Sequence, residues 1–251
     1  MDRIESTANP FIKELKKLKN KSDRYEKGLY LVEGENCVKE LIAFKPEIID
    51  CLLFTEKYEN EFKGFKFYLV SQRIMESLCD TKTPQGIVAL CRMEKQTNIY
   101  SPICIYLDNV KDPGNVGTII RTADAAGMKT VILSKECADL YNSKTVRSTM
   151  GSMFHIDVFY EDEYLSQLKK LKNEGYTILT GSLQAEKSLY EYDFKKKTVI
   201  CIGNEAHGIS ADLYRIGTEN IKIPMPGNAE SLNAGVAGSI IIYEAVRQLN
   251  G

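Results

Sequence analysis

The first residues whose spacing suggests chemistry are one arginine and a glycine that precedes it. They lie in the segment LDNVKDPGNVGTIIRTA, which follows an apolar strand and opens a helix. Gly117 and Arg121 are four residues apart and therefore share one face of that helix. An arginine above a glycine leaves an open floor that an anionic backbone could approach. A turn capped by Asn115, with a solvated arginine, would give the same pattern.

A second loop places a carboxylate between glycines. The apolar strand over residues 198–202 runs directly into Gly203, Glu205 and Gly208. Loops of this kind bind ligands at the C-terminal edge of a parallel sheet, because glycines let backbone groups come close to a ligand. A tight turn between strand and helix is the alternative. His207, in the same loop, is expected to be structural or to face solvent.

A third loop, IKIPMPGNAESLNAG, precedes the last helix. Pro224 and Pro226 prevent ordinary continuation of a strand and stiffen this loop. Ser231 is a good N-cap for a helix over residues 231–248. That helix has apolar or small residues all round, which predicts burial on every side. We therefore expect a second subunit to cover it, and a central helix of a monomeric core is the alternative.

Alternating strands and helices in the second part of the chain must position these loops. Strands are expected over residues 103–108, 130–133, 177–181, 198–202 and 221–223. Helices are expected over residues 115–126, 142–150, 164–173 and 231–248. Strand and helix in turn predict an α/β fold with a mostly parallel sheet and helices on both faces.

The first part of the chain is predicted to be a small α/β domain of its own. A lysine-rich helix begins near residue 9, and the elements that follow again alternate. Strands are expected over residues 29–32, 48–54, 65–70 and 87–91, and helices over 36–44 and 72–79. The polar segment before Pro102 is typical of a linker. We therefore place the domains at 1–95 and 103–251, with a linker at 96–102.

The lysine-rich segment carries a local excess of positive charge. Residues 11–27 hold seven lysines and arginines against three acidic residues. A solvated helix face would explain this pattern. Clustered lysines can also replace the counterions on phosphates, so a nucleic-acid contact is the sharper hypothesis. Its candidate residues are Lys13, Lys16, Lys17 and Lys19.

Composition excludes several other classes of protein. The chain has 251 residues, 43% of them hydrophobic and 27% charged, with a net charge of −1, so it can bury a core and is not coated with basic groups. The longest uncharged stretch, Ser231–Tyr243, is too short to span a bilayer. No apolar signal segment opens the sequence, and seven cysteines without a Cys-x-x-Cys pair favour reduced thiols in the cytoplasm. With two histidines far apart, we expect no metal site.

Together, the three loops resemble those of the SpoU or TrmH-type RNA ribose 2′-O-methyltransferases of the SPOUT class. The resemblance covers roughly residues 103–248. Three ordered motifs carry it: Asn115, Gly117 and Arg121; Gly203, Glu205 and Gly208; Ile223, Pro224, Met225, Gly227, Ser231, Leu232 and Asn233. A smaller match surrounds Arg147. One departure is Ala234-Gly235, where the family often has the bulkier Val-Ser.

The resemblance implies a fold, a cofactor and an assembly. The fold would be a trefoil-knotted SPOUT domain, although chains are generally unknotted, behind a ribosomal-protein-like substrate domain matched at Asn9-Pro10 and Val32–Gly34. The cofactor would be S-adenosylmethionine, and the assembly a homodimer built around the last helix. Backbone groups of the second and third loops would hold the cofactor. The residues implied are Gly203, Gly208, Ile223, Met225 and Leu232. Arg147 would join the four lysines in binding RNA.

The implied chemistry suits these residue types. The sulfonium donor is already activated, so positioning of a weakly acidic ribose hydroxyl is the main task. The family assigns activation of the hydroxyl to the position of Arg121. Neutralising a free arginine at pH 7 would cost at least about 7 kcal/mol. We therefore expect Arg121 to act as a cation that stabilises the developing alkoxide. Asn115, Glu205, Ser231 and Asn233 would orient Arg121, the ribose and the loops.

Other functions find less support in the sequence. No loop matches the dinucleotide fingerprint or the P-loop, and a class I methyltransferase would carry its glycine-rich loop early in the domain rather than late. The N-terminal domain favours ribosomal RNA as the substrate. Two alternatives stay open: a transfer RNA ribose 2′-O-methyltransferase, and a non-catalytic RNA-binding ribosome assembly factor with the same fold.

Overall fold

The structure is a computed structural model of the chain. It describes residues 2–59, 61–62, 64–94, 99–183 and 185–250. The first residues of the predicted linker, 96–98, lie outside the described residues.

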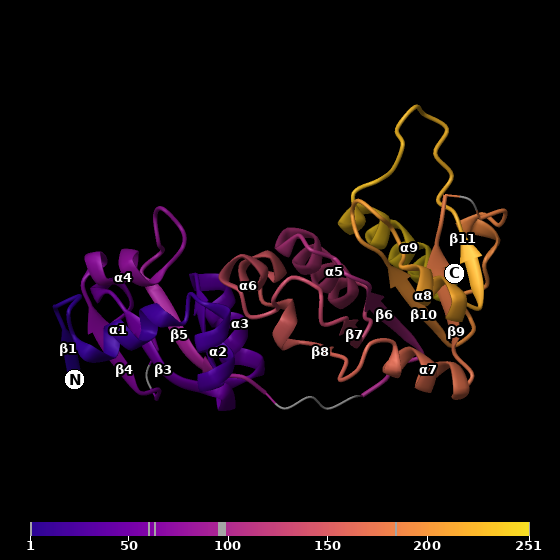
Figure 1. Cartoon of the computed structure of the whole chain (residues 1–251). Coiled ribbons are helices and arrows are strands. Elements are labelled where there is room, and N and C mark those ends of the chain that lie inside the picture. The colour runs from indigo at the N-terminus through magenta and orange to yellow at the C-terminus, as the bar shows by residue number, and fades with distance from the viewer. Residues whose placement is uncertain (1, 60, 63, 95–98, 184, 251) are drawn as a thin grey trace. The chain divides into compact units, whose positions relative to one another are not determined.

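The chain divides into two compact units (Figure 1). Unit 1 consists of Met1–Lys95 together with Asp139–Phe154, and unit 2 consists of Gln96–Ala138 together with His155–Gly251. The segment Asp139–Phe154 thus packs with the N-terminal residues, whereas the sequence prediction places it in the domain 103–251.

Unit 1 has a mixed sheet in the order β1-β4-β3-β5-β2, in which β5 runs antiparallel to β2 and β3. Its strands are β1 (Asp2–Ile4), β2 (Leu29–Glu33), β3 (Ile49–Phe54), β4 (Phe67–Val70) and β5 (Ile87–Arg92). Its helices are α1 (Pro10–Lys17), α2 (Lys21–Lys27), α3 (Glu35–Phe44), α4 (Gln72–Leu78) and α6 (Ser143–Thr149), with 3₁₀ turns η1 (Pro46–Ile48), η2 (Glu56–Tyr58) and η3 (Ser152–Phe154). The predicted small α/β fold is confirmed. The prediction missed β1 and α2, which are only three and seven residues long.

Two ion pairs bind the segment Asp139–Phe154 within unit 1. Arg24, whose side chain is 4% exposed, pairs with Asp139, and Arg147 pairs with Glu33, whose side chain is 6% exposed. Arg24 also donates to the carbonyl of Leu18 at 2.8 Å. Buried charges of this kind depend on their partners, because a lone buried ion is costly.

Unit 2 has the sheet order β11-β9-β10-β6-β7-β8, and each of its described pairings is parallel. Its strands are β6 (Ile103–Leu107), β7 (Thr130–Leu133), β8 (Asp157–Tyr160), β9 (Thr177–Gly181), β10 (Thr198–Ile202) and β11 (Glu219–Ile221). Its helices are α5 (Pro113–Ala125), α7 (Ser166–Asn173), α8 (Ala211–Ile216) and α9 (Ala234–Asn250), with the 3₁₀ turn η4 (Leu189–Glu191). The predicted parallel α/β sheet is confirmed. The prediction missed β8 and α8, and it placed β11 two residues too late.

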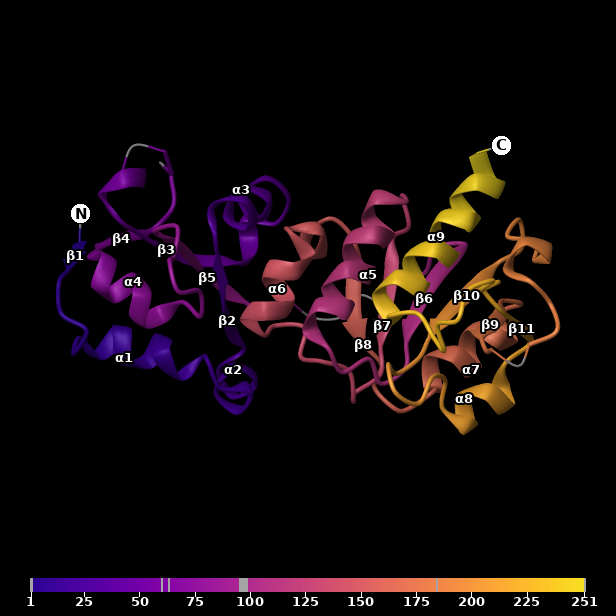
Figure 2. The ribbon, with the colours of Figure 1, turned by 90° about the horizontal axis from the view of Figure 1, so that it is seen from above.

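Helices cover both faces of the sheet of unit 2. Residues of α7 and α8 pack with Cys201 in one core cluster. The next residue of β10, Ile202, faces the other way: a Cβ added at Gly238 of α9 would lie 2.5 Å from its Cδ1 and 3.3 Å from Ile119 of α5. Consecutive strand residues point to opposite faces, so β10 serves both layers. Figure 2 shows α5 and α9 side by side.

The caps of α5 and α9 differ from those predicted. Asp112, not Asn115, caps α5, and its carboxylate accepts a hydrogen bond from the Asn115 backbone N–H at 2.9 Å. Asn233, not Ser231, caps α9, and its Oδ1 accepts from the Val236 N–H at 3.2 Å. Asp and Asn are preferred at this position because a short side chain can reach the free amides of the first turn. The side chain of Asn115 is therefore available for another contact.

Within its own chain, helix α9 is buried on one side only, which contradicts the alternative of a central helix in a monomeric core. The cover by a second subunit stays a prediction. Ile241, Ile242 and Ala245 are buried within their own unit. On the other side, Val236 is 47% exposed and Tyr243 is 51% exposed. The helix thus has one buried face and one exposed face although its sequence is apolar all round, because the sheet covers only one of the two faces. None of the described helices combines the length with the apolar composition that spanning a bilayer requires.

Candidate active site

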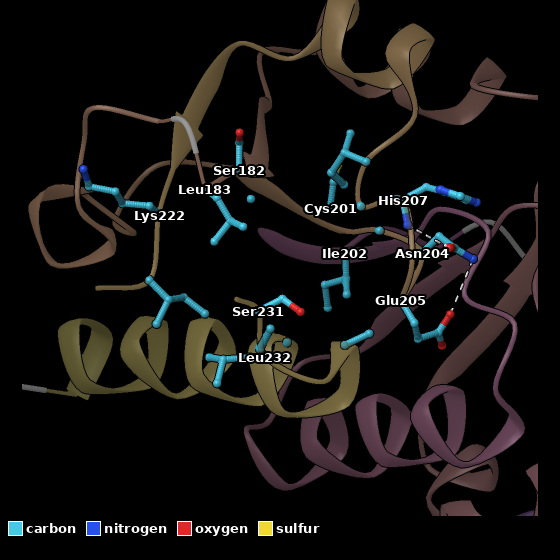
Figure 3. Close-up of a pocket in the computed structure, with 18 of the residues that line it drawn as sticks. Ser182, Leu183, Cys201, Ile202, Asn204, Glu205, His207, Lys222, Ser231 and Leu232 are labelled. Carbon is cyan, nitrogen blue, oxygen red and sulfur yellow. Dashed lines mark hydrogen bonds between the residues drawn. The ribbon is translucent and has the colours of Figure 1, made fainter. Parts of the chain in front are cut away.

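A cavity of about 780 Å³ lies where the chain leaves the C-terminal ends of β9 and β10 (Figure 3). This volume falls within the range of about 300–1,000 Å³ that is typical of small-molecule sites. The five residues predicted to bind a cofactor all line it: Gly203, Gly208, Ile223, Met225 and Leu232. Apolar side chains supply much of the rest of the wall, among them Leu183, Ile202, Ile209 and Ile241. The arrangement suits a ligand that is held by backbone groups between apolar walls.

Gly203 makes the loop after β10 sterically possible. A Cβ at this position would lie 2.2 Å from the carbonyl carbon of Gly208 and 2.4 Å from the backbone nitrogen of Ile209. The loop is closed on itself by two hydrogen bonds between the backbones of Asn204 and Gly208, at 2.9 and 2.8 Å. Gly208 has a φ of 68°, which glycine adopts without strain. The backbone of this loop therefore forms one compact wall of the cavity.

Glu205 joins this loop to the loop after β6. Its carboxylate accepts hydrogen bonds from the Asn115 side chain at 2.8 Å and from the backbone N–H groups of Asp112 and Lys111 at 3.2 and 3.3 Å. Burial alone would raise the pKa of Glu205, but the hydrogen bond from Asn115 and the backbone donors outweigh burial and lower the pKa. Glu205 therefore stays ionised near neutral pH, as the predicted orienting role requires.

The asparagines of the first and third motifs come together above a glycine. A Cβ at Gly235 would lie 3.2 Å from the Oδ1 atoms of both Asn115 and Asn233. Gly235 belongs to the Ala-Gly pair that departs from the family pattern. Here its missing side chain leaves room for both amides at the start of α9. Ser231 lies nearby in the chain and lines the cavity.

Arg121 lies outside the lining of the cavity. It is exposed on α5, one turn after the buried Gly117. In the part of the chain that the structure describes, Arg121 makes no hydrogen bond or ion pair. The neighbouring Thr122 contacts Ser239 of α9, with 3.0 Å between their hydroxyl oxygens. The guanidinium is thus presented to solvent beside the α5–α9 contact.

The predicted RNA-binding residues of unit 1 fall into two groups. Lys13 and Lys16 have no ion-pair partner among the described residues. Lys17 pairs with Glu14 at 2.6 Å, and its hydrogen bond, together with that of Lys27, lowers the pKa of Glu14 to about 2. Lys19 pairs with Asp80 at 3.2 Å. Arg147 is engaged by Glu33, as described above. Lys13 and Lys16 are therefore the two cations of the set with uncommitted charge.

Sequence reasoning missed other residues of the site. Ser182 and Leu183 follow β9 directly and line the cavity from the side opposite α9 (Figure 3). Asn204, one residue beyond Gly203, also lines the cavity, and Asp108 directly follows β6. The signal was available, because in a parallel sheet every loop after a strand end opens at the same edge. The glycine pattern alone does not single out the polar residues beside it.

Known proteins resemble this chain over most of its length. Residues 102–243 match the family model described as the SpoU rRNA Methylase family, and residues 9–89 match the MRM3-like substrate binding domain. The 23S rRNA (guanosine(2553)-2′-O)-methyltransferase RlmP of Bacillus subtilis is 36% identical over 246 residues, which cover 97% of this chain and 98% of that protein. The 23S rRNA (guanosine-2′-O-)-methyltransferase RlmB of Escherichia coli is 27% identical over 87% of this chain and 98% of its own length.

A solved structure also matches nearly the whole chain. The AdoMet-bound rRNA methyltransferase from Sinorhizobium meliloti superposes with a TM-score of 0.88 and 29% sequence identity, covering 99% of this chain and 98% of that one. Both units therefore have a counterpart in a single solved protein.

Proposed function

The chain belongs to the SpoU rRNA methylase family, and from this premise we propose that its cavity binds S-adenosylmethionine for methylation of a ribose 2′-hydroxyl in ribosomal RNA. It is an S-adenosylmethionine-dependent RNA 2′-O-ribose methyltransferase with a SPOUT-type α/β fold. One observation carries the assignment of the cofactor site: the five motif residues implied for the cofactor line a single cavity of about 780 Å³.

Cofactor binding and stabilisation of the reacting oxygen are assigned to different residues, at the cavity and on α5. Backbone groups of Gly203, Ile223 and Leu232 would hold the cofactor, and the apolar walls would exclude water from it. When bound, S-adenosylmethionine supplies a methyl group on an activated sulfonium. Arg121 remains a cation, stabilises the alkoxide that develops on the ribose oxygen and pairs with the adjacent phosphate. The hydroxyl proton would pass to solvent water as the ribose oxygen takes the methyl group, because Arg121 already carries its proton. Glu205 fixes the loops through its hydrogen bonds.

Transfer of labelled methyl groups tests this function directly. Ribosomes and transfer RNA from a strain that lacks the gene would be incubated with the purified protein and radiolabelled S-adenosylmethionine, and 2′-O-methyl positions would then be mapped. We expect one ribosomal nucleotide to be unmodified in the strain and to regain its methyl group in vitro. Label only in transfer RNA would favour the first alternative. RNA binding without any calorimetric signal for S-adenosylmethionine would favour the non-catalytic assembly factor.

Lys13 and Lys16 are proposed to contact RNA phosphates. Replacing both with glutamate should weaken RNA binding and flatten its dependence on salt. Each lost phosphate contact changes the slope of log affinity against log salt by about 0.7–0.9. Filter binding at several salt concentrations measures the slope. Lys17→Glu combined with Lys19→Glu makes the same change in charge and serves as the matched comparison. Both of these lysines are already in ion pairs and should affect the slope less. An unchanged slope in the variant of Lys13 and Lys16 would leave α1 as a solvated helix face.

The exposed side of α9 is proposed to form a homodimer interface. Val236, Tyr243 and Leu249 are about half exposed on this helix. Exposed apolar side chains such as these are typical of the centre of a subunit interface.

The cellular compartment is a separate proposal. Buried cysteines throughout the chain support the proposal that the enzyme works in the reducing cytoplasm. The trefoil knot stays a prediction from the family resemblance.

A charge on the exposed side of α9 is expected to split the dimer. Tyr243→Glu would place a carboxylate in an apolar interface without a partner. Light scattering should give about twice 28.3 kDa for the wild type and the monomer mass for the variant. Asn173→Glu, at the exposed end of α7, adds the same charge elsewhere and should leave the mass unchanged. Ile241→Glu would be a poor test, because Ile241 is buried and lines the cavity of its own chain. A monomeric wild type with full activity would rule the dimer out.

A further inference from the structure

The loops after β6 and β10 are joined by more side chains than Glu205. Asp108, which is fully buried, accepts a hydrogen bond from the Ser210 backbone N–H at 2.8 Å and another from the Tyr164 hydroxyl at 3.2 Å. The Asn204 side chain donates to the carbonyl of Asn109 at 2.8 Å. The two loops are thus joined by successive contacts: those of Asp108 lie at the strand ends, and those of Asn204 and Glu205 lie at the cavity.

Asn204 uses both ends of its side-chain amide. Its Oδ1 accepts from the backbone N–H groups of Ala206 and His207, at 2.9 and 3.1 Å. Its Nδ2 donates to the Asn109 carbonyl, and Figure 3 shows the amide beside Glu205 in the wall of the cavity. The acceptor end therefore folds the loop, whereas the donor end attaches it to the neighbouring loop. A side-chain amide carries its donor and its acceptor on separate atoms, so it performs both functions at once.

The Asn109 carbonyl is held ready to receive this hydrogen bond. Asn109 has a φ of 57°, in the left-handed region that asparagine tolerates better than most residues. Its own N–H donates to the Ser134 hydroxyl at 3.0 Å. Asn109 is thus anchored through its N–H from the side of β7, and its carbonyl accepts the hydrogen bond from the loop after β10. Asn204 therefore attaches the cofactor loop to a part of the chain that is itself anchored.

We propose that Asn204 is a positioning residue for S-adenosylmethionine, because its amide holds the Gly203–Gly208 loop against the loop after β6. Through this attachment Asn204 fixes the position of the loop that forms the cavity wall. It also directs Glu205 towards the N–H groups of Lys111 and Asp112. The proposal rests on the proposed function of the cavity. It assigns Asn204 no contact with the reacting atoms.

Asn204→Asp removes the donor end, which also reaches Oε2 of Glu205 at 3.5 Å, and places a second carboxylate beside Glu205. The aspartate keeps an acceptor for Ala206 and His207 but replaces the donor with an oxygen that faces the Asn109 carbonyl. We expect S-adenosylmethionine to bind about tenfold more weakly, which corresponds to about 1.4 kcal/mol. KM for S-adenosylmethionine should rise in parallel, while kcat at saturating cofactor stays near the wild-type value. Asn173→Asp is the matched control, since it makes the same substitution on an exposed residue of unit 2.

Several outcomes separate the possible readings. A drop in thermal midpoint with an unchanged KM in the folded fraction would make Asn204 merely structural and overturn the proposal, as would an unchanged affinity. If Asn204→Asp fails to fold, Asn109→Val disrupts the same hydrogen bond at its acceptor. A β-branched residue disfavours the left-handed conformation that places the carbonyl of residue 109. This variant should raise KM in the same way. If the wild type itself binds no S-adenosylmethionine in calorimetry, the proposed function fails instead.

Discussion

Arg121→Ala is expected to lower the rate of methyl transfer by about 10²–10³-fold while the affinity for S-adenosylmethionine stays close to that of the wild type. The rate should fall because the guanidinium is the cation proposed to stabilise the developing alkoxide. The affinity should hold because Arg121 does not line the cavity and is exposed on α5. Single-turnover transfer to the RNA and calorimetry with the cofactor measure the two quantities separately.

Arg121→Lys distinguishes geometry from charge. Lysine keeps the positive charge but cannot offer two parallel N–H donors to an oxygen and a phosphate. We therefore expect the lysine variant also to lose most of its activity. Normal turnover by the alanine variant would remove Arg121 from the catalytic machinery. Loss of cofactor affinity together with rate would instead show that the helix face had been disturbed.

Gly203→Ala is expected to impair the cofactor site at its centre. The new methyl group would meet backbone atoms of Gly208 and Ile209 at 2.2–2.4 Å, and backbone cannot swing aside as a flexible side chain can. Forcing such an overlap costs about 1–3 kcal/mol or more, so cofactor affinity should fall roughly tenfold to a hundredfold. Calorimetry with S-adenosylmethionine measures the loss.

A second glycine controls for a general effect on folding. A Cβ at Gly227 would meet nothing within 4 Å, so Gly227→Ala should keep the thermal midpoint of the wild type. Gly203→Ala should lose cofactor affinity while its far-ultraviolet circular dichroism still shows the α/β fold. Wild-type affinity in this variant would mean that the loop can open without cost, and the cavity wall would then need another explanation.

Much of the catalytic fold could be predicted because its signals are local. Apolar strands that end in glycine loops predicted the parallel sheet of unit 2 and the loop of Gly203 at its edge. The helix caps could not be predicted from residue type alone, since Asp112 and Asn115 are both good caps and only their positions in the turn decide between them. Because Asp112 caps α5, the side-chain amide of Asn115 is available to bind Glu205.

Other features depend on distant parts of the chain. Whether a lysine is available for RNA depends on its neighbours in space: Lys19 meets Asp80, which lies 61 residues away in sequence. The apolar sequence of α9 gave no hint of which side the sheet would cover. The partners of Arg24 and Glu33 were invisible for the same reason, because each lies more than 100 residues away in the chain.

The segment Asp139–Phe154 affects which parts of this protein can be exchanged by recombination between related genes. Unit 1 is not one continuous stretch of the gene, since this segment is encoded between β7 and β8 of unit 2. A single recombination event near residue 95 would therefore replace only part of the substrate-binding unit. It would leave Asp139 opposite a foreign counterpart of Arg24. Exchange of unit 1 between relatives would thus require both of its chain segments to be transferred together.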